Sequence, residues 1–111
     1  MNKRLAMLQS MTASGQADSF VWYALALEYQ NAQDFDQALT TFAQLRQRDP
    51  DYLPQYLIAG QLHSRLGRAE EAKDLFRAGI ALAQRQGDAR ALSELQGALE
   101  QEADEADDSS G

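Results

Sequence analysis

The stretch that decides the fold is residues 19–52, which read SFVWYALALEYQNAQDFDQALTTFAQLRQRDPDY. Apolar residues recur in it with helical spacing over two segments, residues 19–31 and 35–48. An aspartate suited to capping a helix stands directly before each segment, at Asp18 and Asp34. Asp49-Pro50 ends the second segment, because the residue before a proline avoids the helical region. The stretch therefore predicts two consecutive helices.

The pattern returns after 34 residues, over residues 53–86. Large residues then fall on large ones and small residues on small ones, with Leu25/Ala59 and Leu45/Gly79 as the weaker matches. Small residues let two helices approach closely, and the aromatic residues fill the space around them, which requires a consistent register. The matched positions are Trp22 with Tyr56, Ala26 with Gly60, Tyr29 with His63, Ala38 with Ala72 and Phe42 with Phe76.

This repeat resembles the tetratricopeptide repeat family, whose motif runs aromatic, leucine, small residue, tyrosine, alanine, aromatic and proline. The second copy departs from the motif at His63, where tyrosine is usual, and at Gln84, where proline is usual. Losing that proline predicts a longer second helix in the second copy. The residues that carry the resemblance are Trp22, Leu25, Ala26, Tyr29, Ala38, Phe42 and Pro50, then Tyr56, Gly60, His63, Ala72 and Phe76.

The resemblance implies an all-α fold, a right-handed superhelix of antiparallel helix pairs with about six helices. We expect one domain over residues 1–100, with a partial repeat at 2–17, full repeats at 19–52 and 53–86, and a capping helix at 88–100. Residues 101–111 lack leucine, aromatic and β-branched residues and are expected to form a disordered acidic tail. Six of the 17 acidic residues lie between Glu100 and Asp108.

Composition points the same way and excludes several classes of protein. Alanine occurs 19 times and leucine 15 times, whereas valine and isoleucine together occur three times, which favours helices over strands. No cysteine and one histidine leave no thiolate or multi-histidine metal site. The longest apolar run, Phe20 to Leu27, is too short to span a membrane. We expect a soluble cytoplasmic protein without cofactor or metal.

No catalytic arrangement is recognisable, and the net charge of -7 argues against binding to nucleic acid. The chain is therefore not expected to be an enzyme. His63 stands where the repeat has a packing tyrosine, which favours a structural role over an acid–base role. Arginines spaced along helix surfaces among acidic neighbours are expected to form a solvated face.

The resemblance implies a concave groove, lined by the first helix of each pair, that binds another protein or peptide. Apolar side chains stand where several polar groups of the family's carboxylate clamp would be, so an apolar peptide or an amphipathic helix suits this groove better. By position, its lining would include Phe20, Tyr23, Leu27, Asn31, Leu57, Ile58, Gln61 and Arg65.

Two alternatives stay open at this point. The groove could be open, or it could be filled by the protein's own helices, for instance by Leu92 and Leu95 of the capping helix. The same apolar strip could instead be the interface of a homodimer, since exposed apolar patches often mark interfaces. The leading hypothesis is an adaptor, scaffold or co-chaperone that is a monomer or a weak homodimer.

Overall fold

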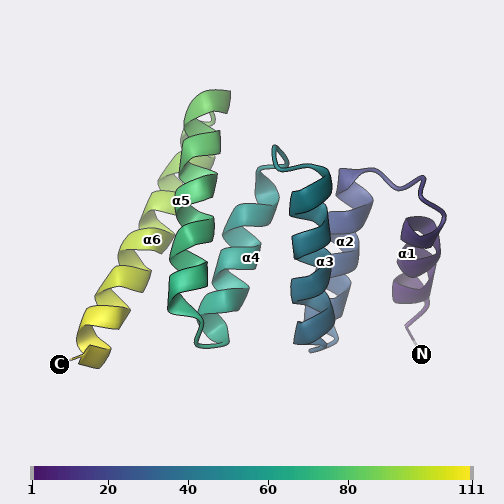
Figure 1. Ribbon diagram of the computed structural model, residues 1–111, viewed down its shortest axis with the longest axis horizontal. Coiled ribbons are helices and arrows are strands. Elements are labelled where there is room, and N and C mark those ends of the chain that lie inside the picture. The colour runs from purple at the N-terminus through teal and green to yellow at the C-terminus, as the bar shows by residue number, and fades with distance from the viewer. Residues whose placement is uncertain (1, 111) are drawn as a thin grey trace. The chain divides into compact units, whose positions relative to one another are not determined.

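The computed structural model describes residues 2–110, with side chains for residues 2–103. The expected all-α architecture is confirmed, because the described residues form helices and turns without a strand (Figure 1). The helices are α1 (Lys3–Ala13), α2 (Ser19–Asn31), α3 (Phe35–Arg48), α4 (Pro54–Arg65), α5 (Ala69–Gln86) and α6 (Ala89–Ser110).

The chain divides into two compact units, Met1–Tyr52 and Leu53–Gly111. We call them unit 1, which contains α1 to α3, and unit 2, which contains α4 to α6. The boundary falls between Tyr52 and Leu53, which is also where the sequence divides the first repeat from the second. Each unit is described by itself below.

Unit 1 is organised around the close contact of α2 with α3. Ala26 and Ala38 have no exposed surface. Phe42, the aromatic residue that follows Ala38 in the repeat motif, is also buried. Both helices begin as expected, because the Asp18 and Asp34 carboxylates accept the backbone N–H groups of Val21 and Gln37 at 3.1 and 3.4 Å. Small buried residues therefore set the helix contact, and aspartates set where the helices start.

α1, which lies where a partial repeat was expected, covers a second side of α2. Leu8 is buried with Ala24 and Leu25 in one apolar cluster. At the rim of this contact, Gln9 Nε2 donates to the Tyr29 hydroxyl at 2.9 Å, and Arg4 pairs with Glu28 at 2.8 Å. α1 thus shields an apolar side of α2 that would otherwise be exposed, as the end of a repeat array requires.

Unit 2 repeats the helix pair with α4 and α5. A Cβ atom added to Gly60 would collide with the ring of Phe76, so only glycine allows this approach of α4 to α5. Ala72 has no exposed surface, and Tyr56 is 4% exposed. The small positions of the second copy therefore do what the sequence pattern predicts.

The turns between the paired helices also repeat. Asp34 N donates to the Tyr29 carbonyl and Arg68 N to the His63 carbonyl, each at 2.9 Å. The residue before each donor is left-handed, with φ of 63° at Gln33 and 77° at Gly67. The 34-residue period is therefore present in the backbone as well as in the side chains.

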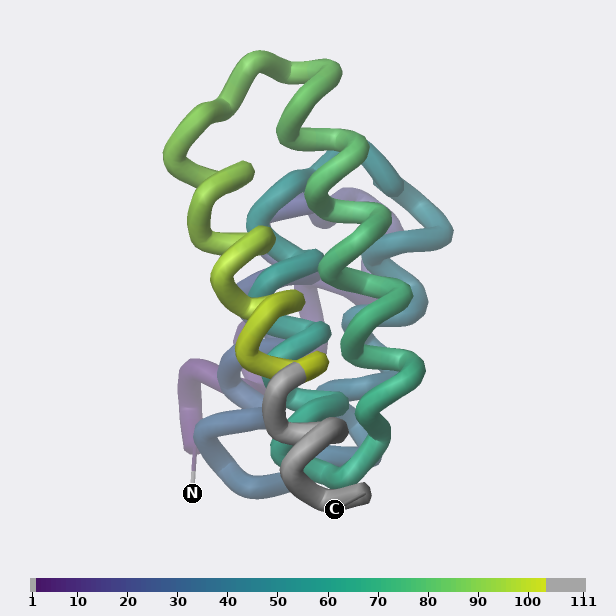
Figure 2. The backbone as a smooth tube through the Cα atoms, turned by 90° about the vertical axis from the view of Figure 1, so that its left-hand side faces the viewer, coloured from purple at the N-terminus to yellow at the C-terminus, as the bar shows by residue number. Residues whose placement is uncertain are grey.

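The second helices of the two repeats, α3 and α5, differ in length as expected. α3 has 14 residues and is followed by Asp49-Pro50, whereas α5 has 18 residues and ends at Gly87, which has a φ of 70°. Asp88 then accepts the Ala91 N–H at 3.0 Å and caps α6. α6 runs antiparallel to α5 and beside it (Figure 2).

The end of α6 corrects the sequence-based boundary at residue 100. The helix continues to Ser110, and Glu102 is 7% exposed, with its carboxylate accepting the Ser64 hydroxyl of α4. Alanine and glutamate favour helix, and no glycine or proline interrupts residues 98–110. Residues 101–103 therefore belong to the folded unit and not to a disordered tail, and Gly111 lies outside the described residues.

Candidate functional site

One side of α2 combines an exposed aromatic residue with two half-buried apolar ones. It carries the four groove residues predicted from unit 1, Phe20, Tyr23, Leu27 and Asn31, which lie within one helical face and are called the α2 face below. Phe20 is 63% exposed, Tyr23 and Leu27 are half-buried, and Asn31 is exposed. A large apolar side chain with such exposure is unusual for a core position, which makes this face the leading candidate site.

Tyr23 is held in place by two other rings. Its ring lies 6.4 Å from that of buried Phe42 in an edge-to-face arrangement and 5.4 Å from that of Tyr52. Burial raises the pKa of the Tyr23 hydroxyl, and the neighbouring Tyr52 raises it further. Tyr23 is therefore a fixed, uncharged aromatic group near neutral pH.

Tyr52 is a site residue that the sequence reasoning did not include. Burial raises the pKa of its hydroxyl, and the nearby carboxylates of Asp18 and Asp49 raise it further. The available signal was an aromatic residue directly after Asp49-Pro50-Asp51, at the last position of the first repeat. Only the fold brings this position against Tyr23, which lies 29 residues earlier.

The four groove residues predicted from unit 2, Leu57, Ile58, Gln61 and Arg65, occupy one side of α4 and are called the α4 face. Leu57 and Ile58 are half-buried, and Gln61 and Arg65 are exposed. α6 contacts α4, and the hydrogen bond from Ser64 to Glu102 joins the two helices next to Arg65. Leu95, one of the residues named for a filled groove, is instead buried against α5 at Gly79.

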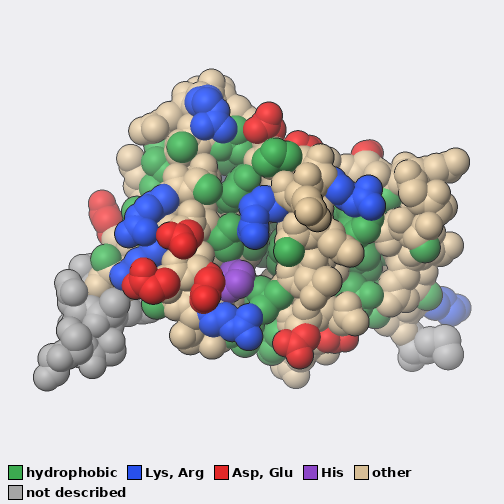
Figure 3. Space-filling view, in the orientation of Figure 1, with side chains coloured by type: hydrophobic (Ala, Val, Ile, Leu, Met, Phe, Trp, Pro, Cys, Tyr) green, Lys and Arg blue, Asp and Glu red, His purple; other side chains and the backbone are tan. Residues whose placement is uncertain are grey.

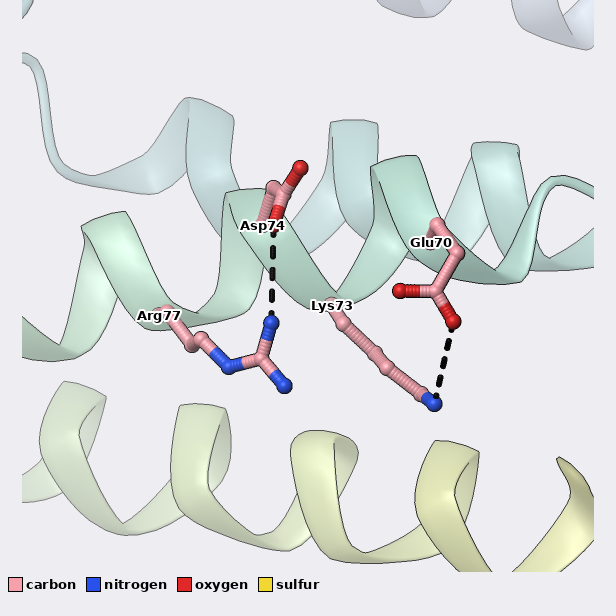
Figure 4. Close-up of polar contacts among 4 residues, drawn as sticks. All are labelled: Glu70, Lys73, Asp74 and Arg77. Atoms are coloured by element: carbon pink, nitrogen blue, oxygen red, sulfur yellow. Dashed lines mark hydrogen bonds and ion pairs between the residues drawn. The ribbon is translucent and has the colours of Figure 1, made fainter. Parts of the chain in front are cut away.

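The charged side chains of α5 form short ion pairs along the helix. Lys73 pairs with Glu70 at 3.5 Å and Arg77 with Asp74 at 3.4 Å (Figure 4). Side chains of both signs are interspersed over α5 and α6 on the face drawn in Figure 3. This mixture is typical of a solvated helix surface and offers no single-sign patch for a polyanion.

Neither a metal site nor a membrane span is found in the described part of the chain. No group of three or more histidine, cysteine, aspartate or glutamate side chains there could hold a metal ion. No helix there is long and apolar enough to cross a bilayer. His63, the single histidine, is half-buried on α4 at the position of Tyr29 in the repeat.

Comparison with known proteins agrees with this architecture. The family model described as tetratricopeptide repeat matches residues 29–95. None of the proteins with curated descriptions matches the chain. A tetratricopeptide repeat domain protein from Salinibacter ruber is 38% identical, with a TM-score of 0.74 over 78% of this chain and 97% of that chain.

Two further solved structures have similar folds. Protein BPP2914 from Bordetella parapertussis is 28% identical, with a TM-score of 0.80 over 95% of this chain and 91% of that chain. PcrH, a Pseudomonas aeruginosa protein crystallised with the chaperone binding region of PopD, is 19% identical. Its TM-score is 0.84 over 92% of this chain and 77% of that chain.

The paired helices, the buried small residues and these matches lead to one assignment. Proteins built from this repeat are in general interaction modules that bind other proteins and are not enzymes. The fold supports the same coarse role here. The chain belongs to the tetratricopeptide repeat family.

Proposed function

We propose that this chain is an adaptor, scaffold or co-chaperone that binds an apolar peptide or an amphipathic helix of another protein. The α2 face and the α4 face are each proposed as a contact surface, and each is considered by itself. The observation that carries the proposal is Phe20, which is 63% exposed and lies in line with half-buried Tyr23 and Leu27. Exposed apolar side chains that adjoin others on one face are a common feature of interaction sites.

The spacing of the α2 face favours an amphipathic partner. Phe20, Tyr23 and Leu27 follow one another at intervals of three and four residues, so their side chains form a continuous apolar strip along the helix. An amphipathic helix binds such a strip with its own apolar face, and an extended peptide does so with alternate side chains. PcrH has a similar fold and was crystallised in complex with the chaperone binding region of PopD, which supports a segment of another protein as the partner.

A photo-crosslinking amino acid placed at Phe20 in the full chain tests the proposal in cells that produce it. We expect crosslinks to a different protein from position 20. The matched control is the same amino acid at Met7, which is 55% exposed and lies on α1. Position 7 is expected to give none of these products, because α1 is not part of the proposed site.

The α4 face is tested separately through Leu57. A photo-crosslinking amino acid at Leu57 is expected to give crosslinks to a different protein while circular dichroism shows unchanged helix content, since the side chain at this position is half-buried. The absence of crosslinks from position 57 would remove the α4 face from the proposal. Equal crosslinking from positions 20 and 7 would contradict the proposal as a whole.

The second candidate function is self-association through the same strip. It is favoured by Phe20, whose exposure would be removed in a homodimer as readily as in a complex with another protein. Sedimentation of the purified chain over a range of concentrations separates the two functions. A dimer that Phe20→Ala dissociates, together with crosslinks only between copies, would establish the second function and exclude the first.

A further inference from the structure

Two large apolar side chains of α1 face solvent. Met7 is 55% exposed and Met11 is 41% exposed. They are four residues apart, so they lie next to each other on one side of the helix. Leu8, by contrast, is buried in one cluster with Ala24 and Leu25 of α2. α1 therefore has a second apolar side, which is open to solvent, and we call Met7 and Met11 the α1 face.

The positions that match the α1 face are buried in α3 and in α5. Counting back 34 residues from α3 places Phe42 on Leu8, and Leu8, Phe42 and Phe76 are all buried. The same count places two buried residues on each methionine of the α1 face. They are Thr41 and Leu75 for Met7, and Leu45 and Gly79 for Met11.

In α3 and α5 a preceding helix provides this burial. α3 packs on α2, and α5 packs on α4. At the position matched to Met11, a Cβ atom added to Gly79 would lie 2.8 Å from Tyr56 Cβ of α4. No helix precedes α1 within residues 2–110, the part of the chain that the structure describes. Relative to its two counterparts, the α1 face therefore lacks the packing of one further helix.

The charges of α1 favour a helix that runs antiparallel to it. Lys3 and Arg4 lie in the first turn, and α1 contains no acidic residue. Basic side chains are unfavourable there, because the N-terminal end of a helix carries a partial positive charge. Arg4 is compensated by Glu28 at 2.8 Å, whereas Lys3 is exposed and lies one turn before Met7 on the same side. An antiparallel helix would bring its partially negative C-terminal end next to Lys3.

We propose that a second copy of this chain covers the α1 face with its own α1, in antiparallel orientation. A two-fold axis between Met7 and Met11 lets Met7 of each copy contact Met11 of the other, so one face supplies both halves of the interface. The same axis places Lys3 at the C-terminal end of the other α1, which has no basic residue in its last turn to repel it. Methionine side chains are flexible and adapt to such a contact. This inference goes beyond the proposed function, because it uses α1 and not the α2 face.

Sedimentation of the purified full chain over a range of concentrations tests the inference. We expect a reversible dimer at high concentration. Met7→Ala with Met11→Ala should raise its dissociation constant by about tenfold or more, because the two apolar side chains are no longer buried in the interface. Circular dichroism should show unchanged helix content, since alanine favours helix. The control is Phe20→Ala, which removes an exposed apolar side chain from α2 and should leave the dimer intact.

Disulfide formation reports the orientation of the two helices, because the chain contains no cysteine of its own. Met7→Cys and Met11→Cys are made as separate variants and mixed in equal amounts. Antiparallel pairing predicts that the disulfide between the two different variants forms several-fold in excess of a random distribution. An excess of disulfides between identical variants would overturn the proposed arrangement.

Lys3→Glu separates the dimer contact from the stability of α1 itself. In the single chain an acidic residue in the first turn should stabilise the helix. In the dimer it should weaken association by about two- to fivefold, because it meets the C-terminal end of the other α1. Thermal unfolding at low concentration and sedimentation at high concentration measure the two effects. A dimer that Lys3→Glu leaves unchanged or tightens would contradict the antiparallel contact.

The remaining outcomes identify a different occupant or none. A chain that stays monomeric, or a dimer that the methionine variant leaves intact, would overturn the inference. A dimer that Phe20→Ala dissociates would overturn it in favour of self-association through the α2 face. A photo-crosslinking amino acid at Met7 should join copies of this chain, and products with a different protein would make that protein the occupant. Crosslinking from position 20 is read separately, so the inference and the proposed function can fail independently.

Discussion

Unit 1 and unit 2 contain the same repeat, but they treat one matched position in opposite ways. Leu45 of α3 is a large side chain with no exposed surface. The matching residue of α5 is Gly79, where a Cβ atom would lie 2.8 Å from Tyr56 Cβ and 2.9 Å from Leu95 Cδ2. Unit 2 therefore has no side chain at this position, and Leu95 of α6 packs against Gly79 instead.

The difference has a consequence for the two candidate faces. In unit 2, α6 packs on α5 and also reaches α4, where Ser64 bonds Glu102. In unit 1 the additional helix is α1, which packs on the side of α2 that contains Ala24 and Leu25 and leaves Phe20 exposed. The first helix of the repeat is therefore partly covered by α6 in unit 2, where it is α4. In unit 1, where it is α2, it keeps an exposed aromatic residue, Phe20.

The largest effect is expected where unit 1 depends on the side chain that unit 2 lacks. Leu45→Ala should lower the free energy of unfolding by about 2–5 kcal/mol, because it leaves a cavity in a fully buried position. Urea unfolding followed by circular dichroism measures the loss. Ala43→Gly, at an exposed position of the same helix, is the control and should cost about 1 kcal/mol. A loss at Leu45 no larger than this control would contradict the packing comparison.

The next effect concerns the helix contact of unit 2. Gly60→Ala should destabilise the protein by about 1–3 kcal/mol, because the added methyl group collides with the ring of Phe76. Gly97→Ala is the matched control on α6, where nothing lies within 4 Å of the added Cβ. The control should stabilise by about 0.5–1 kcal/mol, since alanine favours helix over glycine. Thermal unfolding should therefore show a lower stability for Gly60→Ala and a higher stability for Gly97→Ala. A change of the same sign in both variants would refute the close approach of α4 to α5.

The contact of α6 with α4 should be weaker than either core. Ser64→Ala removes the hydroxyl that Glu102 accepts and should cost about 1–3 kcal/mol, because it leaves a buried carboxylate with one hydrogen bond fewer. Hydrogen exchange should then quicken in α6 but not in α3. Ser93→Ala, on an exposed position of α6, serves as the reference. Unchanged protection of α6 would show that Glu102 does not hold this helix.

The N-terminal caps of α3 and α5 also differ, and a variant that adds the missing cap should stabilise the protein by a smaller amount. Asp34 caps α3, whereas the matching Arg68 makes no side-chain cap for α5 although its backbone is similar, with φ -105° and ψ 68° against -90° and 74°. Arg68→Asp should therefore raise the free energy of unfolding by about 1 kcal/mol. Arg68→Ala is the control that removes the arginine without adding a cap. Equal stability of the Arg68→Asp and Arg68→Ala variants would show that position 68 does not cap α5 as Asp34 caps α3.

The smallest effect should appear only at high pH. Tyr23 and Tyr52 have pKa values raised above the ordinary value of 10.0. Their contribution to stability is present below pH 10 and is lost as the pH rises from 10 through the raised pKa values, because the unfolded chain releases these protons first. Urea unfolding below and above pH 10 measures this loss. Replacing both residues by phenylalanine should reduce it, and an unchanged loss would contradict the prediction.

Much of the fold was predictable because it depends on local signals. Asp18, Asp34, Asp88, Gly67 and Gly87 set the ends of helices through hydrogen bonds or backbone conformations within a few residues. The repeat of size classes predicted which residues would be buried, since Ala26, Ala38 and Ala72 must be small wherever two helices touch. The α2 face was also predictable in outline, because it follows from which positions the helix contacts use.

Other features could not be read from the sequence. Gly79 appeared as a weak match in the repeat, and its function depends on Leu95, which comes from a different helix. The acidic segment after Glu100 suggested disorder, but Glu102 accepts a hydrogen bond from the Ser64 hydroxyl, which comes from 38 residues earlier in the chain. Tyr52 joins the candidate site only because the end of α3 returns to the start of α2.

The sequence by itself determined the helices, their pairing and the 34-residue period, because capping, helix propensity and the size of small residues act over short distances along the chain. The tertiary structure decided which apolar side chains stay accessible and which carboxylate, that of Glu102, becomes buried. Those outcomes depend on what the remaining helices of each unit cover. The exposed aromatic face of α2 is therefore a property of the folded unit 1, and the repeat motif alone does not specify it.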